Sequence, residues 1–190
     1  MAVLVGAIVF FVILGVVVVS MAIGIYNSLV ALRNQVDRSW ANIDVILKQR
    51  FDEIPQLVQV VEQYAKHEKA TIAAVTEART RYGSARTTEE KVKAAQAMTF
   101  ALQGVMAIGE AYPELKSNQN FTQLQSRLSA LEESIADRRE TYNESVTNLN
   151  TRIDQFPDLF FARLLGYHKM DMYQVAAQDR AVPNLKMNLG

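Results

Sequence analysis

The hydrophobic pattern of the chain is strongest at its N-terminus, where residues 1–32 include no charged side chain. Residues 1–25 are almost wholly apolar, and Ser20 is the one polar side chain among them. A helix over this stretch is ~37 Å long, which exceeds the hydrocarbon core of a bilayer, roughly 30 Å thick. The pattern therefore predicts a transmembrane helix at residues 1–25.

A cleaved signal peptide is a poor fit to the same stretch. Such a peptide begins with basic residues and has an apolar core of roughly 7–15 residues. Here no Lys or Arg precedes the apolar run, and a lipoprotein signal would need a cysteine, which the chain lacks. We therefore interpret the stretch as a retained single-pass anchor. Within it, Ser20 and Gly24 form a small-residue pair that suits packing against another helix.

Beyond the anchor, apolar residues recur at intervals of three and four, which is the period of an α-helix. A first helix is predicted over residues 26–51, continuous with the anchor. The acidic pair Asp52 and Glu53, followed by Pro55, then predicts the start of a second helix that ends at Gly83.

Two further helices follow. Thr87 and Glu90 form a capping box that starts a third helix near Thr88, and Pro113 stops it. This helix carries a stripe of mostly small residues over positions 92–109, which allows close approach of another helix. A fourth helix is capped at Ser117 or Asn118 and runs to about Phe156.

The fourth helix shows the clearest coiled-coil seam, with apolar residues alternating at three and four from Phe121 onward. The step through Arg138, Tyr142 and Val146 departs from the heptad and should unwind a supercoil locally. Four helices with short links predict an all-α protein. Its transmembrane helix continues into an up-down-up-down antiparallel four-helix bundle over residues 26–157.

In such a bundle the fourth helix returns toward the membrane, so residues 158–190 form a membrane-proximal apolar segment and a C-terminal tail. The sequence here fits a short amphipathic segment in the membrane interface or a contact between subunits. The alternative is that it plugs the base of the bundle. The residues predicted for this contact are Phe156, Phe160, Phe161, Arg163, Leu164, Leu165 and Tyr167.

Composition narrows the function classes. The 190 residues include twenty basic and twenty acidic side chains, and this neutral balance argues against nucleic-acid binding. Without cysteine there is no disulfide, thiol nucleophile or thiolate metal site. His67 and His168 both lack a Glu three residues earlier, so the paired Glu-x-x-His pattern of metal-binding bundles is missing. With no phosphate-binding loop or nucleophile motif either, we expect no enzyme, cofactor or metal.

Three polar or aromatic positions remain as candidates. Glu68 falls on the apolar seam of the second predicted helix, and Arg138 on that of the fourth. An ion pair between Glu68 and Arg138 or Arg139 would fix the register of the two helices, although a small rotation would leave both at the rim. Trp40, the single tryptophan, is interpreted as a core residue or, alternatively, a surface for a partner.

Several ordered motifs resemble those of the bacterial LemA family. They cover nearly all of the chain between Tyr26 and Tyr167. They include Tyr26-Asn27, Trp40-Ala41-x-Ile43-Asp44, Ile54-Pro55-x-Leu57-Val58, Tyr64-Ala65-x-His67-Glu68, Glu110-Ala111-Tyr112-Pro113-Glu114-Leu115, Asn150-Thr151-Arg152-Ile153 and Phe156-Pro157. The resemblance implies an N-terminal span followed by a helical bundle, and no known enzymatic activity.

The resemblance also bears on three details. Arg139 matches the family's arginine better than Arg138, which favours Arg139 as the partner of Glu68. The tail from Met172 to Leu185 resembles the family's ending, which suggests that it docks. Many family members have a lipoprotein cysteine where this chain has Ser20-Met21-Ala22, and those lipoproteins hold the helical domain outside the cytoplasm.

The sequence thus places the protein in the bacterial inner membrane with two opposed indications of its side. Basic residues follow the span, with Arg33 the first, and favour a cytoplasmic domain, whereas the lipoprotein resemblance favours the outside. The leading hypothesis is a non-enzymatic membrane scaffold that self-associates as a homo-oligomer through its bundle and anchor. The alternative is an adaptor or regulator of a membrane protease or other membrane enzyme. Its expected partners are the lipid bilayer, its own copies and another membrane protein.

Overall fold

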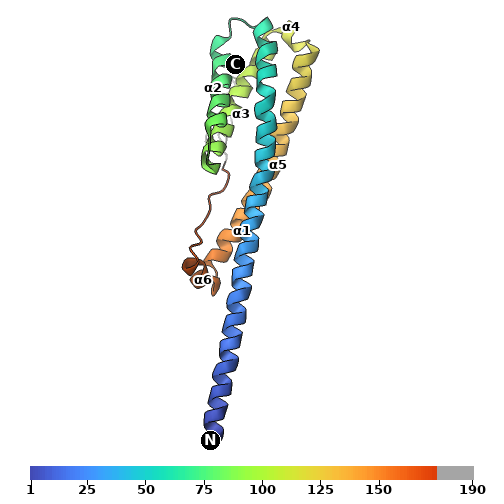
Figure 1. Cartoon of the computed structure of the whole chain (residues 1–190). Helices are drawn as coiled ribbons and strands as arrows, with labels where there is room; N and C mark the ends of the chain where they lie inside the picture. The colour runs from blue at the N-terminus through green and yellow to red at the C-terminus, as the bar shows by residue number, and fades with distance from the viewer. Residues whose placement is uncertain (175–190) are drawn as a thin grey trace, which may run out of the picture. The chain divides into compact units, whose positions relative to one another are not determined.

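The computed structural model describes residues 1–174, and all regular structure within them is helical (Figure 1). The helices are α1 (Ala2–Tyr64), α2 (Lys69–Ser84), α3 (Thr88–Ala111), α4 (Pro113–Lys116), α5 (Gln119–Asp154) and α6 (Asp158–Leu164). The all-α class and the long apolar N-terminal helix are confirmed. The part of the predicted tail beyond Gln174, including Pro183 and Leu185, lies outside the described residues.

The chain divides into two compact units. Unit 1 takes Met1–Asn42 and Glu140–Met172, and the described part of unit 2 takes Ile43–Arg139 together with Tyr173 and Gln174. Helices α1 and α5 therefore contribute to both units.

Helix α1 is longer than the sequence pattern suggested, because it continues through Pro55 to Tyr64. The predicted helix boundary at Asp52–Pro55 is therefore wrong. Proline in a helix interior removes one hydrogen bond and crowds the preceding turn. Here the buried face continues across it, since Ile54, Leu57 and Val61 are all buried at the spacing set by Leu47. That continuous burial stabilises the helix against the cost of the proline.

The second predicted helix consequently begins too early. The chain turns at residues 65–68, and α2 starts at Lys69. His67, expected in the middle of a helix, lies exposed in this turn. The later boundaries are confirmed: α2 ends at Ser84, and the Thr87–Glu90 capping box opens α3 with both of its hydrogen bonds.

The remaining boundaries are confirmed as well. Helix α3 ends at Ala111, and Pro113 opens the short helix α4. The Asn118 Oδ1 accepts a hydrogen bond from the Phe121 N–H at 3.1 Å, so Asn118 is the cap of α5.

Unit 2 contains one hydrophobic core to which α1, α2, α3, α4 and α5 all contribute. Its buried residues include Leu57, Val75, Met98, Leu115 and Leu128. The small-residue stripe predicted on α3 is only partly its buried face: Ala95, Leu102 and Gly109 are buried, whereas Val92, Thr99 and Met106 are half-buried.

Gly109 shows why a small residue is needed on that face. A β-carbon built at Gly109 would lie 2.7 Å from Cε1 and Cζ of the Phe121 ring. Phe121 is itself buried in the core of unit 2. The aromatic ring therefore packs directly on the backbone of α3.

Unit 1 begins with the apolar part of α1, whose most apolar 18-residue window has no buried residue. Burial starts at Ile25 and continues with Leu29 and Val36. On α5 the seam residues Tyr142, Val146, Leu149 and Ile153 are buried, as the sequence predicted. Phe156, which follows the end of α5, is exposed. The Ser39 and Ser145 hydroxyl groups lie 3.0 Å apart, and the Trp40 and Tyr142 rings pack edge to face with their centroids 5.8 Å apart. Because the first contact joins 39 to 145 and the second joins 40 to 142, α1 and α5 run antiparallel in this unit.

Candidate functional site

The most unusual surface of the described chain is the outward face of α6 in unit 1. A surface helix normally buries its apolar residues and exposes its polar ones. In α6 the buried residues are Asp158 and Ala162, while Phe160 is 63% exposed and Leu164 is 83% exposed. At 3.6 residues per turn, these two pairs lie on roughly opposite sides of the helix. The usual amphipathic pattern is therefore inverted.

Phe156 extends this apolar surface from the turn between α5 and α6. It is 81% exposed, and its ring meets the Phe160 ring edge-on at a centroid distance of 6.0 Å. Leu165 and Arg163 are also exposed, whereas Phe161 and Tyr167 are half-buried. We call Phe156, Phe160, Leu164 and Leu165 the α6 patch.

The buried side of α6 is held by an ion pair. The Asp158 side chain is 4% exposed, and its Oδ1 lies 2.8 Å from Nε of Arg152 on α5. A buried carboxylate without a partner would be costly, so this pair fixes α6 with Asp158 inward. With Asp158 inward, Phe160 and Leu164 point outward.

The chain after α6 is held equally firmly. Gly166 has a φ of +73°, and the Tyr167 and Gly166 N–H groups donate to the Ala162 and Arg163 carbonyls, which is the Schellman pattern. A β-carbon would strain the backbone at such a φ, so glycine is favoured at position 166.

Asn150 fastens the segment that follows to α5. Its Nδ2 donates to the Met170 carbonyl at 2.8 Å, and its Oδ1 accepts from the Met170 N–H at 2.9 Å. The Lys169 ammonium pairs with Asp154 at 2.7 Å. Asn150 and Arg152 belong to the Asn150-Thr151-Arg152-Ile153 motif, so two of its members hold α6 and the chain beyond it.

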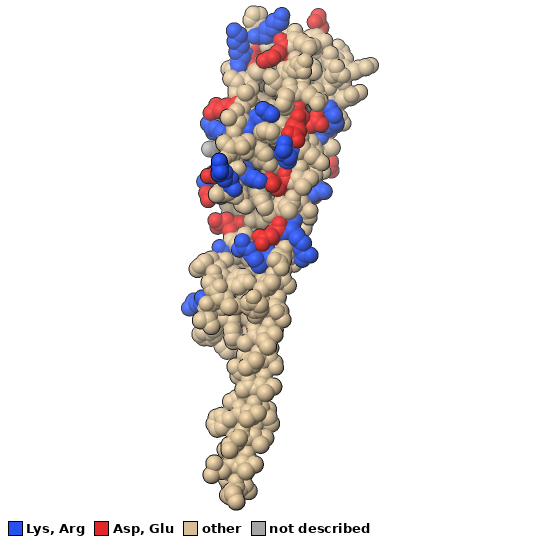
Figure 2. Space-filling model, viewed as in Figure 1, with Lys and Arg blue, Asp and Glu red and all other residues tan. Residues whose placement is uncertain are grey.

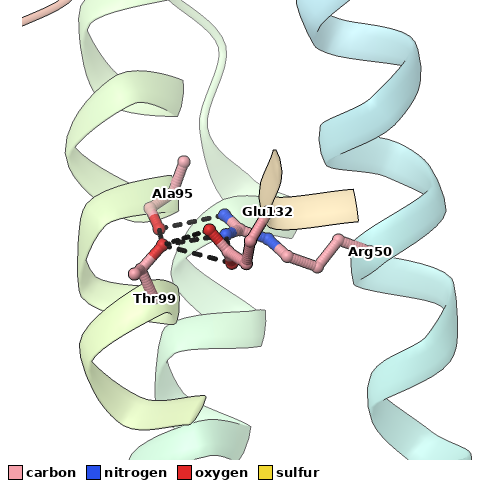
Figure 3. Close-up of polar contacts among 4 residues, drawn as sticks. All are labelled: Arg50, Ala95, Thr99 and Glu132. Carbon is pink, nitrogen blue, oxygen red and sulfur yellow. Dashed lines mark hydrogen bonds and ion pairs between the residues drawn. The ribbon is translucent and has the colours of Figure 1, made fainter. Parts of the chain in front are cut away.

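Unit 2 contains a buried polar cluster around Arg50 (Figure 3). Arg50 is 2% exposed and occupies the seam of α1, three residues after Leu47 and four before Ile54. Its guanidinium donates to Thr99 Oγ1 at 2.8 Å and to the Ala95 carbonyl at 3.0 Å. It also forms an ion pair with Glu132 of α5, whose side chain is 35% exposed.

The Arg50 cluster borders a surface groove between α3 and α5, to which Thr99 and Glu132 contribute. The other lining residues are Leu102, Gln103, Met106, Leu128 and Ser129. The groove has one carboxylate, and Arg50 already neutralises it.

Two tyrosines lie buried in unit 2. Tyr82 donates a hydrogen bond to Asp44 at 3.2 Å, and Asp44 also pairs with Lys91 at 2.7 Å. Burial, with the nearby Asp44 charge, raises the pKa of Tyr82 well above its usual range. Burial likewise raises the pKa of Tyr173, although Arg50 and Arg139 oppose the shift.

Tyr173 shows that the chain returns to unit 2 after unit 1. Its ring is buried, and the Arg139 guanidinium lies 5.9 Å from the ring centroid. The Gln174 carbonyl accepts a hydrogen bond from Gln96 of α3. The described start of the tail is therefore docked.

The structure does not bring Glu68 together with either predicted arginine. Glu68 precedes α2 and accepts a hydrogen bond from the Tyr112 hydroxyl at 3.2 Å. Arg138 donates to the Ser134 carbonyl at 3.4 Å, and Arg139 lies over Tyr173. The ion pair that joins α1 to α5 at a buried seam position is Arg50–Glu132. Continuing the α1 seam from Leu47 by three residues would have found Arg50.

The other predicted positions lie in unit 1. Trp40 is half-buried against Tyr142. Ser20 and Gly24 are exposed, and a β-carbon at Gly24 would meet nothing within 4 Å. Among residues 1–174, no three His, Cys, Asp or Glu side chains gather as a metal site would require.

These features define an all-helical protein with an exposed apolar N-terminal helix. The chain belongs to the LemA family, whose pattern matches residues 39–187. Family membership and the apolar helix together are consistent with a membrane-anchored bacterial protein.

Proteins related in sequence include three magnetosome proteins. Magnetosome proteins MamQ 1 and MamQ 2 of Paramagnetospirillum magneticum are each 31% identical to the chain over 74 residues. MamQ of Magnetospirillum gryphiswaldense is 30% identical over 73 residues. These alignments cover 39%, 39% and 38% of this chain and 27% of each relative. The chain therefore matches about a quarter of the length of these relatives.

Proposed function

We propose that the protein is a non-enzymatic, single-span membrane scaffold that self-associates through its helical domain and anchor helix. One observation carries the proposal. Helix α1 begins with an uncharged, wholly exposed segment and goes on, without a break in the helix, to supply buried side chains to both units. A long exposed apolar surface is unfavourable in water, so this segment requires a lipid environment.

Two further features support an interaction role. The long helices α1, α3 and α5 all contribute to the core, which suits the up-down-up-down bundle that the sequence predicts. Such a bundle presents long helical faces to other proteins. In the described part of unit 2, Arg50 is paired with Glu132 and Asp44 with Lys91, so these charged groups serve contacts between helices.

The alignment with MamQ does not extend the proposal to a magnetosome. It covers 27% of those proteins, so the parts that serve their own compartment need no counterpart here. The proposed role stays at the level of membrane anchoring and association.

The decisive test is the mass of the full chain extracted in mild detergent, measured by light scattering with the detergent contribution subtracted. We expect a complex of two or more copies. A monodisperse monomer would contradict self-association.

Cross-linking in native membranes separates the proposal from an adaptor role. Adducts of the chain with itself support a scaffold. A single adduct with one foreign protein, with no self-adduct, would show an adaptor or regulator of another membrane protein and overturn the scaffold.

A further inference from the structure

We propose that the α6 patch inserts into the surface of the same bilayer that α1 spans, so that the protein contacts the membrane at two points. This inference rests on the anchor of the proposed function and names the lipid surface as the partner of a second site. The patch consists of Phe156, Phe160, Leu164 and Leu165 as defined above.

The inverted orientation of α6 is fixed by specific contacts on both of its sides. The Arg152–Asp158 pair holds the acid inward, and the Schellman turn at Gly166 ends the helix in a fixed conformation. Asn150 then secures the returning chain at Met170. These contacts leave Phe160 no position on the inner face, so the outer face remains apolar whenever α6 is formed.

Helix α6 lies beside the part of α1 that follows the apolar segment, when positions are compared along the α1 axis. From the Ser39–Ser145 contact, Ile153 lies eight residues further along α5, which is level with about Ala31 of the antiparallel α1. Helix α6 follows Ile153, toward the N-terminal end of α1. In the view of Figure 1, α6 lies level with the part of α1 that directly follows the apolar segment.

The membrane dimensions agree with that level. If residues 1–25 cross the hydrocarbon, the uncharged residues 26–32 extend α1 by ~10 Å beyond it. The headgroup region on each side of a bilayer is about 5–7 Å deep. Residues level with positions 25–31 therefore lie in or next to this region.

The charge distribution of unit 1 fits contact with a membrane as well. In the view of Figure 2, the apolar segment of α1 and the surface directly next to it are almost entirely uncharged, in contrast to the charged surface further along the molecule. Exposed Arg163 can extend its guanidinium toward lipid phosphates while its methylene groups lie along apolar surface. Tyr26 and Tyr167 supply the aromatic side chains that are typical of membrane interfaces.

A second protein copy is a less suitable occupant of the α6 patch. Its covering surface would itself have to lie among lipid headgroups. The bilayer surface is already there, since α1 brings it to this level. The lipid surface therefore requires no additional component.

The test uses nitroxide accessibility in proteoliposomes containing the full chain. Because the chain has no cysteine, single labels are introduced by Phe160→Cys and Leu164→Cys, with Glu144→Cys as the control on the exposed side of α5 in the same unit. Relaxation by oxygen, which concentrates in lipid, is compared with relaxation by a water-soluble nickel chelate. We expect the oxygen-to-nickel ratio at 160 and 164 to exceed that at 144 several-fold.

Two further readings separate the alternatives. If labels at 160 and 144 give equal ratios, α6 lies in water and the inference is wrong. If the label at 160 shows spin–spin broadening that disappears on dilution with unlabelled chain, a second copy covers the patch, which also overturns it. A label introduced by Val12→Cys reports on the anchor alone: exposure of that label to nickel would refute the anchor of the proposed function as well.

Discussion

The Arg50 cluster in unit 2 and the α6 patch in unit 1 both depart from the usual distribution of residues, in which charged side chains lie outside and apolar side chains lie inside. They differ in whether other residues of the chain compensate for that departure. Arg50 places a charge inside the protein, and Thr99, Ala95 and Glu132 satisfy it. Helix α6 also places a charge inside, and Asp158 forms an ion pair with Arg152. Its apolar outer face, however, has no covering contact within the described chain.

The difference teaches where to look for partners. A buried charge that has partners within the chain contributes to stability and helix register. An exposed apolar face that no residue covers indicates a partner outside the chain. Substitutions in the Arg50 cluster should therefore change the free energy of unfolding, whereas substitutions in the α6 patch should change membrane contact and leave that free energy nearly unaltered.

The largest effect is expected for Glu132→Ala, which leaves the buried Arg50 guanidinium without its counter-charge. Breaking a buried ion pair costs about 3–5 kcal/mol, and the loss here should be near the lower end because Glu132 is partly solvated. Chemical unfolding in detergent, followed by helical circular dichroism, measures this loss.

A matched control uses Arg50→Met combined with Glu132→Leu. Replacing a whole buried pair by apolar residues is often neutral or stabilising. The double variant should therefore be more stable than Glu132→Ala alone. Equal losses in both would show that packing, not the uncompensated charge, sets the cost.

A smaller loss is expected for Gly109→Ala, because its β-carbon would lie 2.7 Å from the Phe121 ring. Overpacking costs about 1–3 kcal/mol, and replacing a helical glycine returns roughly 0.5–1 kcal/mol. The net loss should be about 1 kcal/mol in the same unfolding experiment. Gly104→Ala, which meets only the Thr71 methyl group at 3.1 Å, should lose less. An unchanged or higher stability for Gly109→Ala would contradict the packing described.

In unit 1, Arg152→Ala should loosen α6 locally while the rest of the unit stays folded. The buried Asp158 carboxylate would lose its partner, which favours local opening and should speed amide exchange on the order of tenfold over residues 159–165. Hydrogen–deuterium exchange with mass spectrometry measures this. Arg163→Ala, at an exposed position, should leave the exchange unchanged. Equal exchange in the unaltered chain and in both variants would show that the ion pair does not hold α6.

The smallest change in unfolding free energy is expected for Phe160→Ser, within about 0.5 kcal/mol in detergent, because exposed positions contribute little to folding. The contrasting control is Phe121→Ala in the core of unit 2, where truncation should cost about 3–5 kcal/mol. A core-sized loss for Phe160→Ser would mean that the ring is packed inside the protein, and the comparison of the two regions would fail.

Much of the fold could be predicted from helix signals that act locally. The capping box at Thr87 and the cap at Asn118 define helix starts through contacts between near neighbours, and the sequence located both. Pro55 misled for the same reason: it is a local start signal, but burial of Ile54 and Leu57 by distant residues overrode it. Local chemistry identifies helix ends, and tertiary packing decides which of them are used.

The candidate sites also differ in whether they depend on local sequence or on tertiary packing. The apolar residues of the α6 patch could be named from the sequence because they cluster within a short segment, but the sequence could not show which of them are exposed: Phe161, predicted with them, is half-buried. The Arg152–Asp158 and Arg50–Glu132 pairs were missed, since each depends on which faces of two helices meet. Glu68 was chosen by its place on the seam and Arg139 by the family resemblance, yet Tyr112 and Tyr173 proved to be their neighbours. An ion pair between helices requires a rotational setting that seam positions alone do not supply.

The central claim, that the α6 patch is covered by lipid, can be tested most directly by tryptophan quenching. Trp40 is the sole tryptophan and lies ~22 Å along α1 from Ile25, so the unaltered chain in bilayers of brominated lipids provides an unquenched reference. The variant Phe160→Trp, in a chain that also carries Trp40→Phe, moves the probe to the patch. We predict strong quenching of this variant, greatest for bromines near the headgroup end of the acyl chains. Quenching as weak as that of Trp40 would contradict the account.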